Sequence, residues 1–274
     1  MTEPRAYEVY AIRYATAQRN EAEVFIGGDP HHSGLAMDYF LWVARNELHT
    51  VVVDTGFDLA AAQKRGRQLL VEPGEGLRRL GIDCSQVRHV IITHLHYDHA
   101  GNLPLFPRAR FHLQDREMAF ATGRHMAHSF FAHAYELEGV LSMVRLAYDA
   151  RVQFHDADAE IVPGITVHHV GGHTHGLQVV RIWTRIGWVV LASDAAHYLA
   201  NMTSGRPFPI VADVTQMVAG WERLKQLASR TQFIVPGHDP LVMKRYHAPD
   251  PSLAGIVVRL DAEPLGGLDG TPQE

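Results

Sequence analysis

Residues 90–99 read Val-Ile-Ile-Thr-His-Leu-His-Tyr-Asp-His, an apolar run followed by a cluster of polar side chains. Such an apolar run is typical of a buried strand. Of the six residues that follow Thr93, four carry an imidazole or a carboxylate, the groups that bind zinc in proteins. We therefore predict a strand that delivers metal ligands into the loop behind it, as in a metal-dependent hydrolase.

The composition is that of a globular protein and excludes several classes. The 274 residues are 46% hydrophobic and 20% charged, which argues against disorder. The net charge is −5 and there is no basic run, so we expect no nucleic-acid partner. Cys84 is the only cysteine, which rules out an internal disulfide. The chain has neither a secretion signal nor an apolar stretch near the roughly 18 residues that span a bilayer, so we expect a cytoplasmic protein without a membrane partner.

Strand and helix patterns follow one another without a linker that would divide the chain. Strands rich in Val, Ile, Tyr and Phe are predicted at residues 7–14, 24–27, 38–44, 49–53, 90–93, 152–155, 165–170, 178–184, 188–192 and 232–235. Helices are predicted at 59–64, at 76–80, within 114–148 and at 211–229, where one apolar face carries Val214, Met217, Val218, Trp221, Leu224 and Leu227. We predict one domain over residues 1–262 and a flexible tail over 263–274 that is rich in Gly and Pro.

Three further candidate ligands follow predicted strands. His173 comes directly after Gly171-Gly172, Asp194 ends the apolar run Leu191-Ala192-Ser193, and His238 follows Pro236-Gly237. His175 is a rival to His173, but only His173 follows the double glycine, where the backbone can turn tightly.

The spacing of the first cluster divides it into two pairs. His94 and His96 are two residues apart on an extended segment, so both rings can point the same way and suit one metal. Asp98 and His99 come after the turn and suit a neighbouring metal. A carboxylate can join two metals, which makes Asp194 the natural bridging ligand.

These motifs resemble those of the metallo-β-lactamase superfamily. The matching pieces are His94-Leu95-His96-Tyr97-Asp98-His99, Gly172-His173-Thr174, Ser193-Asp194 and Pro236-Gly237-His238, with Asp54-Thr55-Gly56 as the strand-end element before them. The resemblance covers roughly residues 20–245. It implies an α/β (α+β) fold, a four-layer αββα sandwich in which two sheets pack face to face with helices outside. It also implies two divalent metal ions, Zn²⁺ first and Co, Mn or Fe as alternatives. One ion is held by His94, His96 and His173 and the other by Asp98, His99 and His238, and Asp194 bridges them.

Within the superfamily the motifs look most like those of the N-acyl-homoserine lactonase branch. The true β-lactamases generally use cysteine where this chain has Asp194. That branch places a tyrosine three residues after the bridging aspartate, whereas this chain has His197 there and Tyr198 one residue later. The resemblance therefore leaves both as candidates for stabilising the oxyanion.

The activity that this likeness implies is a quorum-quenching lactonase. A metal-bridging hydroxide would attack the carbonyl of an N-acyl-homoserine lactone or a related lactone, and Asp98 would pass a proton to the leaving alkoxide. A homodimer is compatible with the likeness. Asp54 is expected to orient a ligand histidine, and the apolar side chains of residues 114–148 could form core, a dimer contact or an acyl-chain pocket.

Three other functions stay open on the same residues. Two are hydrolases, a glyoxalase II-like thioesterase and a phosphotriesterase-like enzyme, and both would need a basic pocket. Arg206 and Lys244-Arg245 stand near the site loops but form no convincing cluster. The third is a mononuclear-iron persulfide dioxygenase. A metal-binding scaffold without turnover is disfavoured because no expected ligand is missing.

Overall fold

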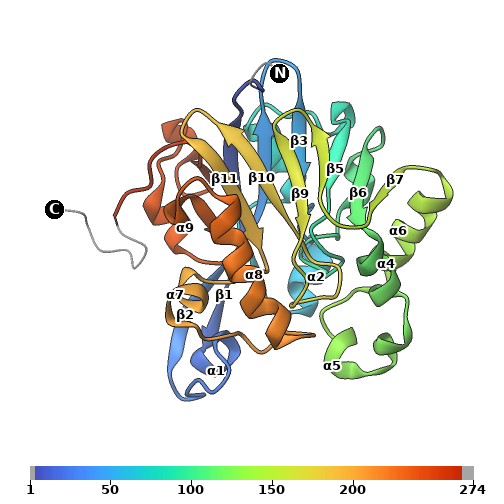
Figure 1. Cartoon of the computed structure of the whole chain (residues 1–274), viewed down its shortest axis with the longest axis vertical. Helices are drawn as coiled ribbons and strands as arrows, with labels where there is room; N and C mark the ends of the chain where they lie inside the picture. The colour runs from blue at the N-terminus through green and yellow to red at the C-terminus, as the bar shows by residue number, and fades with distance from the viewer. Residues whose placement is uncertain (1–3, 267–274) are drawn as a thin grey trace.

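The computed structural model describes residues 4–266, and two β-sheets packed face to face form its centre (Figure 1). The larger sheet has the strand order β13-β1-β2-β3-β5-β6-β7, with β4 paired to β1. Its strands are β1 (Glu8–Asn20), β2 (Ser33–Arg45), β3 (Thr50–Val53), β4 (Gln68–Leu69), β5 (His89–Ile91), β6 (Arg110–Gln114), β7 (Val152–His155) and β13 (Val257–Arg259). β1, β2 and β3 are antiparallel, whereas β3, β5, β6 and β7 run parallel.

The smaller sheet has the order β12-β11-β10-β9-β8. Its strands are β8 (Ala159–Val162), β9 (Ile165–His169), β10 (Gln178–Thr184), β11 (Gly187–Ser193) and β12 (Ile234–Pro236). Between the sheets, Phe40 and Trp42 of β2 share one buried cluster with Val180 and Ile182 of β10. These residues alternate along their strands because successive side chains of a strand point to opposite faces.

Between the strands the chain forms helices, some of which cover the outer faces of the two sheets. They are α1 (Glu21–Val24), α2 (Leu59–Lys64), α3 (Pro73–Arg79), α4 (Asp115–Ala121), α5 (Ser129–Ala132), α6 (Leu137–Tyr148), α7 (Leu199–Ser204), α8 (Val214–Leu227) and α9 (Leu241–Arg245). Short 3₁₀ turns lie at Cys84–Gln86, Leu103–Leu105, Arg124–Ala127, Thr231–Phe233 and Pro251–Leu253. α8 lies over the smaller sheet (Figure 1), and its Trp221 shares a buried cluster with Val190 of that sheet. Leu77 of α3 packs in the cluster outside the larger sheet. The predicted αββα sandwich is therefore confirmed.

Several predicted elements differ from the observed ones. The strand expected at residues 24–27 is wrong, because Asn20 and Glu23 form a reciprocal capping box that begins helix α1 there. The helix expected at 211–229 is α8, but Val214 and Val218 are each 43% exposed and only part of the predicted face is buried. The strands β8 and β13 were not predicted; both are short and are stabilised by pairing with their neighbours.

The predicted tail over 263–274 falls mostly outside the described residues, although Glu263 still pairs with Arg230. No helix among residues 4–266 combines the length and the apolar character needed to cross a membrane.

Candidate metal centre

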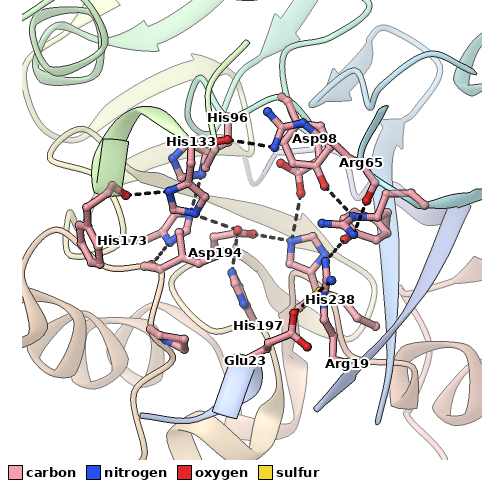
Figure 2. Close-up of a pocket in the computed structure, with 18 residues that line it drawn as sticks. Arg19, Glu23, Arg65, His96, Asp98, His133, His173, Asp194, His197 and His238 are labelled. Carbon is pink, nitrogen blue, oxygen red and sulfur yellow. Dashed lines mark hydrogen bonds and ion pairs between the residues drawn. The ribbon is translucent and has the colours of Figure 1, made fainter. Parts of the chain in front are cut away.

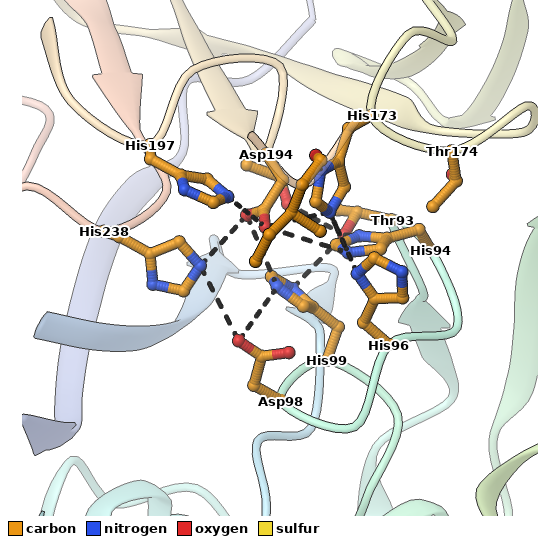
Figure 3. A network of polar contacts seen from close by, with 12 residues as sticks. Thr93, His94, His96, Asp98, His99, His173, Thr174, Asp194, His197 and His238 are labelled. Carbon is orange, nitrogen blue, oxygen red and sulfur yellow. Dashed lines mark hydrogen bonds and ion pairs between the residues drawn. The ribbon is translucent and has the colours of Figure 1, made fainter. Parts of the chain in front are cut away.

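Four strands end at one edge of the two sheets, and a candidate ligand follows each of them. β5 leads into the loop of residues 94–99, β9 into His173, β11 into Asp194 and β12 into His238. All the side chains expected to bind metal are buried and converge on one centre (Figure 3): His94, His96, Asp98, His99, His173, Asp194 and His238. The structure thus brings together the whole set that the resemblance implies.

One half of the centre consists of three imidazoles and a carboxylate oxygen. His173 Nε2 lies 3.2 Å from His94 Nε2 and 2.9 Å from His96 Nδ1. Asp194 Oδ2 lies 3.3 Å from His173 Nε2 and 3.8 Å from His94 Nε2. Ligands bound at roughly 2.0–2.1 Å to a tetrahedral zinc stand about 3.3 Å apart. These four groups therefore have the spacing of ligands to a single ion.

The other half uses the second oxygen of the same carboxylate. Asp194 Oδ1 lies 3.4 Å from His99 Nε2 and 3.2 Å from His238 Nε2. Asp98 Oδ2 completes this group, at 3.8 Å from His99 Nε2 and 3.7 Å from His238 Nε2. Asp194 stands between the halves and offers one oxygen to each, which is one of the ways in which a carboxylate can bridge two ions.

Hydrogen bonds behind the centre fix the orientation of the imidazoles. The Nδ1 atom facing away from the centre lies beside an acceptor in three histidines: His99 at 2.7 Å from Asp54 Oδ2, His238 at 2.8 Å from the carbonyl of Asp38, and His173 at 2.5 Å from the carbonyl of Ile210. An Nδ1–H that donates to these acceptors leaves the Nε2 lone pair free, which is the usual arrangement of metal-ligating histidines.

Asp54 has an uncommon backbone conformation, and two further hydrogen bonds hold its side chain in place. It follows β3 with a φ of 61° and accepts from the Thr93 backbone N–H and the Thr93 hydroxyl, both at 2.8 Å. Ser193, just before Asp194, also has a positive φ, 45°. A positive φ outside glycine is uncommon and concentrates at functional sites. The contact between Asp54 and His99 is the one that the predicted orienting role requires.

Burial and charge set the protonation of the centre. Burial lowers the pKa of His94 and His96 well below the ordinary value and that of His173 to about 3, so these imidazoles are neutral at pH 7. Burial alone would raise the pKa of Asp194, but the surrounding imidazoles outweigh it and hold the pKa well below its usual range. The first half thus combines neutral imidazoles, whose lone pairs can bind a cation, with a carboxylate that carries a negative charge.

The donor set fits a pair of cations. Among residues 4–266, neither His99 Nε2 nor Asp194 Oδ1 has a hydrogen-bond partner, although both atoms are buried. Buried polar atoms without a partner are rare, and cations coordinated by both halves would satisfy these two. The His and Asp clusters therefore fit a dinuclear metal site.

Glu117 of α4 joins the two ligand loops, and no motif in the sequence marks it. Its fully buried carboxylate accepts four hydrogen bonds. Oε1 accepts from the Leu95 N–H at 2.9 Å and the Tyr135 hydroxyl at 3.1 Å, and Oε2 from the Thr174 hydroxyl at 2.6 Å and the Gly176 N–H at 3.2 Å. Leu95 lies between His94 and His96, and Thr174 follows His173, so one carboxylate ties both loops together.

The two candidate oxyanion donors lie in different surroundings. His197 stands at the centre, with Nε2 2.9 Å from Asp194 Oδ2 and its ring stacked on Phe208. The Tyr198 hydroxyl donates to the carbonyl of Ala36 at 3.0 Å and lies outside the cavity that borders the centre. Of the two, the structure brings only His197 to the ligands.

Other residues noted in the sequence lie away from the ligands. The ring of His175 packs on Phe120, with centroids 4.3 Å apart, while its neighbour His173 points to the centre. His168 pairs with Asp158 at 2.8 Å. Of the apolar stretch 114–148, Phe130 and Ala134 line the cavity and Met143 belongs to the core.

A cavity of about 380 Å³ opens on the centre (Figure 2). Metal-ligand candidates form its floor, and Met37, Phe130, Pro209 and Ile210 add apolar surface. Arg206 and Lys244 do not line it. Its basic residues are instead Arg19, Arg65 and Arg67, which the sequence analysis did not single out because they come from two distant segments.

Comparison with known proteins agrees with this geometry. Residues 38–243 match the metallo-beta-lactamase superfamily. An N-acyl homoserine lactonase from a Bacillus species is 28% identical over 224 residues, which cover 75% of this chain and 84% of that protein. A quorum-quenching N-acyl homoserine lactone hydrolase of known structure superposes with a TM-score of 0.75 at 23% identity and covers 90% of this chain and 98% of its own. AidC, a dizinc quorum-quenching lactonase, superposes with a TM-score of 0.67 at 18% identity, covering 87% and 90%. The predicted likeness to lactonases is thus confirmed, and the chain belongs to the metallo-beta-lactamase superfamily.

Proposed function

We propose that this protein is a dinuclear metal hydrolase, with zinc as its metal, that opens the ring of an N-acyl-homoserine lactone or a related lactone. The main support is Asp194, whose two oxygens face separate groups of imidazoles. A carboxylate at that position sets the site apart from the cysteine-containing β-lactamases that the sequence already disfavours. Similarity to N-acyl homoserine lactonases supports the choice of a cyclic ester.

The reaction adds water to the lactone carbonyl, breaks the ring C–O bond and moves a proton to the ring oxygen, which gives a hydroxy acid. Two bound cations would supply an activated water at neutral pH and polarise the carbonyl oxygen. Asp98 lines the cavity, and its carboxylate is the group we assign to carry the proton to the ring oxygen. His197 lines the same cavity.

We assign His197 as the residue that donates a hydrogen bond to the oxyanion. His197 lines the cavity with its Nε2 2.9 Å from Asp194 Oδ2, so the assigned role requires its N–H to turn from this carboxylate to the substrate oxyanion or to be shared between them. Tyr198 is left out because it does not line the cavity. Replacing His197 with Phe should lower kcat more than it raises KM, since a transition-state contact is lost.

The test measures metal content and hydrolysis in the same preparations. Metal-loaded protein is given short- and long-chain acyl-homoserine lactones, an acyl-glutathione thioester and a phosphotriester. His96→Ala and Asp194→Ala should lose bound metal and lactone opening together, whereas His31→Ala, at an exposed loop, should keep both. Rapid cleavage of the thioester or phosphotriester beside inert lactones would overturn the substrate assignment. Full activity in Asp194→Ala would overturn the dinuclear site.

A further inference from the structure

The wall of the cavity next to Asp98 and His238 alternates three arginines with two tyrosines. Figure 2 shows Arg19 and Arg65 on this side of the centre, opposite His133 and His173. We call this set the arginine wall: Arg19, Tyr39, Arg65, Arg67 and Tyr97, all of which line the cavity.

Hydrogen bonds and ring contacts link its members in a row. The Arg65 guanidinium lies 3.9 Å from the centre of the Tyr97 ring, and the Tyr97 hydroxyl accepts from Arg67 Nε at 3.1 Å. Arg19 Nη2 donates to the Tyr39 hydroxyl at 3.0 Å. The side chains are therefore fixed before any ligand arrives, which lowers the entropy lost on binding.

Two of the three arginines have a carboxylate partner. Arg65 donates from Nε and Nη2 to Glu136 Oε1, at 3.0 and 2.7 Å, and shares this carboxylate with Lys64, whose Nζ lies 2.8 Å from Oε2. Arg19 has a weaker partner, since its Nη1 lies 3.5 Å from Glu23 Oε1 and the Glu23 side chain is 47% exposed.

Arg67 has no such partner. Among residues 4–266 no carboxylate oxygen lies within 4.0 Å of its guanidinium, and Nη2 donates no hydrogen bond. Its Nη1 is fixed by the carbonyl of Arg65 at 2.7 Å. The side chain is partly buried, and a bound oxyanion would give Nη2 an acceptor and the guanidinium a counter-charge in direct contact. Both guanidinium groups lie over aromatic rings, Arg65 at 3.9 Å from the centre of Tyr97 and Arg67 at 5.9 Å from the centre of Tyr39, but this packing gives Nη2 of Arg67 no acceptor.

We propose that the substrate carries an oxyanion, a carboxylate or a phosphate, away from the bond that is cleaved, and that Arg67 binds it with help from Arg19. This rests on the proposed function for the reacting end, which is the lactone carbonyl at the metal centre. A guanidinium offers two parallel donors to such an oxyanion. A neutral acyl-homoserine lactone offers the arginine wall only carbonyl acceptors and no charge, so the preferred lactone is an anionic one.

The first experiment compares matched lactones on metal-loaded protein. They are a five-membered lactone with a ring carboxylate, its methyl ester, and the analogue in which a phosphorylated hydroxymethyl group replaces the carboxylate. The wild type should favour one anionic lactone over the ester in kcat/KM by about 10- to 100-fold, the value of one hydrogen bond to a charged group. Which anion is preferred identifies the oxyanion.

Variants then locate the preference. Arg67→Gln should lose about 10- to 100-fold in kcat/KM on the anionic lactone, mostly through KM, and leave the ester unchanged. Arg67→Lys should recover part of the loss, because it restores the charge without the two parallel donors. Arg145→Gln, on an exposed face of α6, is the matched control and should behave as wild type. An ester cleaved as fast as the acid, or an Arg67→Gln defect equal on both, would overturn the proposal.

A binding measurement separates this proposal from the lactonase assignment. Linear dicarboxylates from malonate to adipate, each beside its half-amide, are titrated calorimetrically into the metal-loaded protein. One carboxylate can occupy the metal centre while the other reaches the arginine wall. A preference for the dicarboxylate that Arg67→Gln abolishes supports the anion site even where no lactone is opened. Equal affinities for dicarboxylate and half-amide at every length would refute the anion site, whatever the activity.

Discussion

Replacing Glu117 tests whether one buried carboxylate positions both ligand loops. In Glu117→Gln an NH₂ group takes the place of one oxygen and faces one of two donor pairs. The hydroxyl of either pair, on Tyr135 or Thr174, can turn and accept, but the backbone N–H beside it cannot. One buried N–H is then left without an acceptor, which costs about 1–3 kcal/mol.

For Glu117→Gln the net loss of stability is at the lower end of this cost, whereas for an apolar replacement it is larger. Burial raises the pKa of Glu117, so the four donors do not fully offset the removal of its charge from water, and the neutral amide avoids that cost. We expect Glu117→Gln to lose about 1 kcal/mol of unfolding free energy and Glu117→Leu, which leaves both backbone N–H groups unpaired, about 2–6 kcal/mol.

The assay is urea unfolding of metal-free protein together with metal titration of the folded state. Both variants should bind metal about 10- to 100-fold more weakly, because the loops that carry His96 and His173 lose their common anchor. Glu222→Gln, 66% exposed in its side chain, is the control. Wild-type metal affinity in Glu117→Leu would refute the positioning role, even if the protein were less stable.

Three other substitutions test separate parts of the structure. Asp54→Asn should place an NH₂ group toward His99 Nδ1 and weaken metal binding about 10- to 100-fold, read by competition with a chelating dye. Gly237→Ala would put a Cβ 2.7 Å from Asp194 Oδ1, so metal content by mass spectrometry should fall below that of wild type. Burial, with nearby His89, lowers the pKa of His112 to about 3, so between pH 6.5 and 3 the unfolded chain takes up a proton that the folded one refuses. Stability therefore falls as the pH drops, and His112→Gln should lose about 2 kcal/mol less than wild type between pH 7.5 and 5 in urea unfolding; equal losses would contradict this.

The sequence predicts those parts of the site whose signal is local. Asp194 ends an apolar strand, and His173 follows two glycines, so each candidate ligand is marked by its own neighbours in the chain. The two-sheet architecture follows for a similar reason, because the long strands β1, β2 and β10 are rich in strand-forming residues. Short strands such as β13 have no such pattern, since pairing with β1 makes them strands.

The groups that the sequence does not reveal act through contacts between distant segments. In the sequence Glu117 looks like an ordinary helix residue. Its role arises because α4 packs against two loops, and its carboxylate contacts Leu95, 22 residues before it, and Gly176, 59 residues after it. Arg67 follows α2, whereas Arg19 closes β1, and only the pairing of β4 with β1 brings their backbones to one wall. Basic residues that lie near the ligands in the sequence therefore do not predict which ones line the cavity. Arg206 pairs with Glu21 at 2.9 Å, and the arginines of the cavity come from other segments. The chemistry of the metal centre can be predicted from motifs, but the proposed preference for an anionic substrate rests on Arg67, whose Nη2 the tertiary fold leaves without an acceptor among residues 4–266.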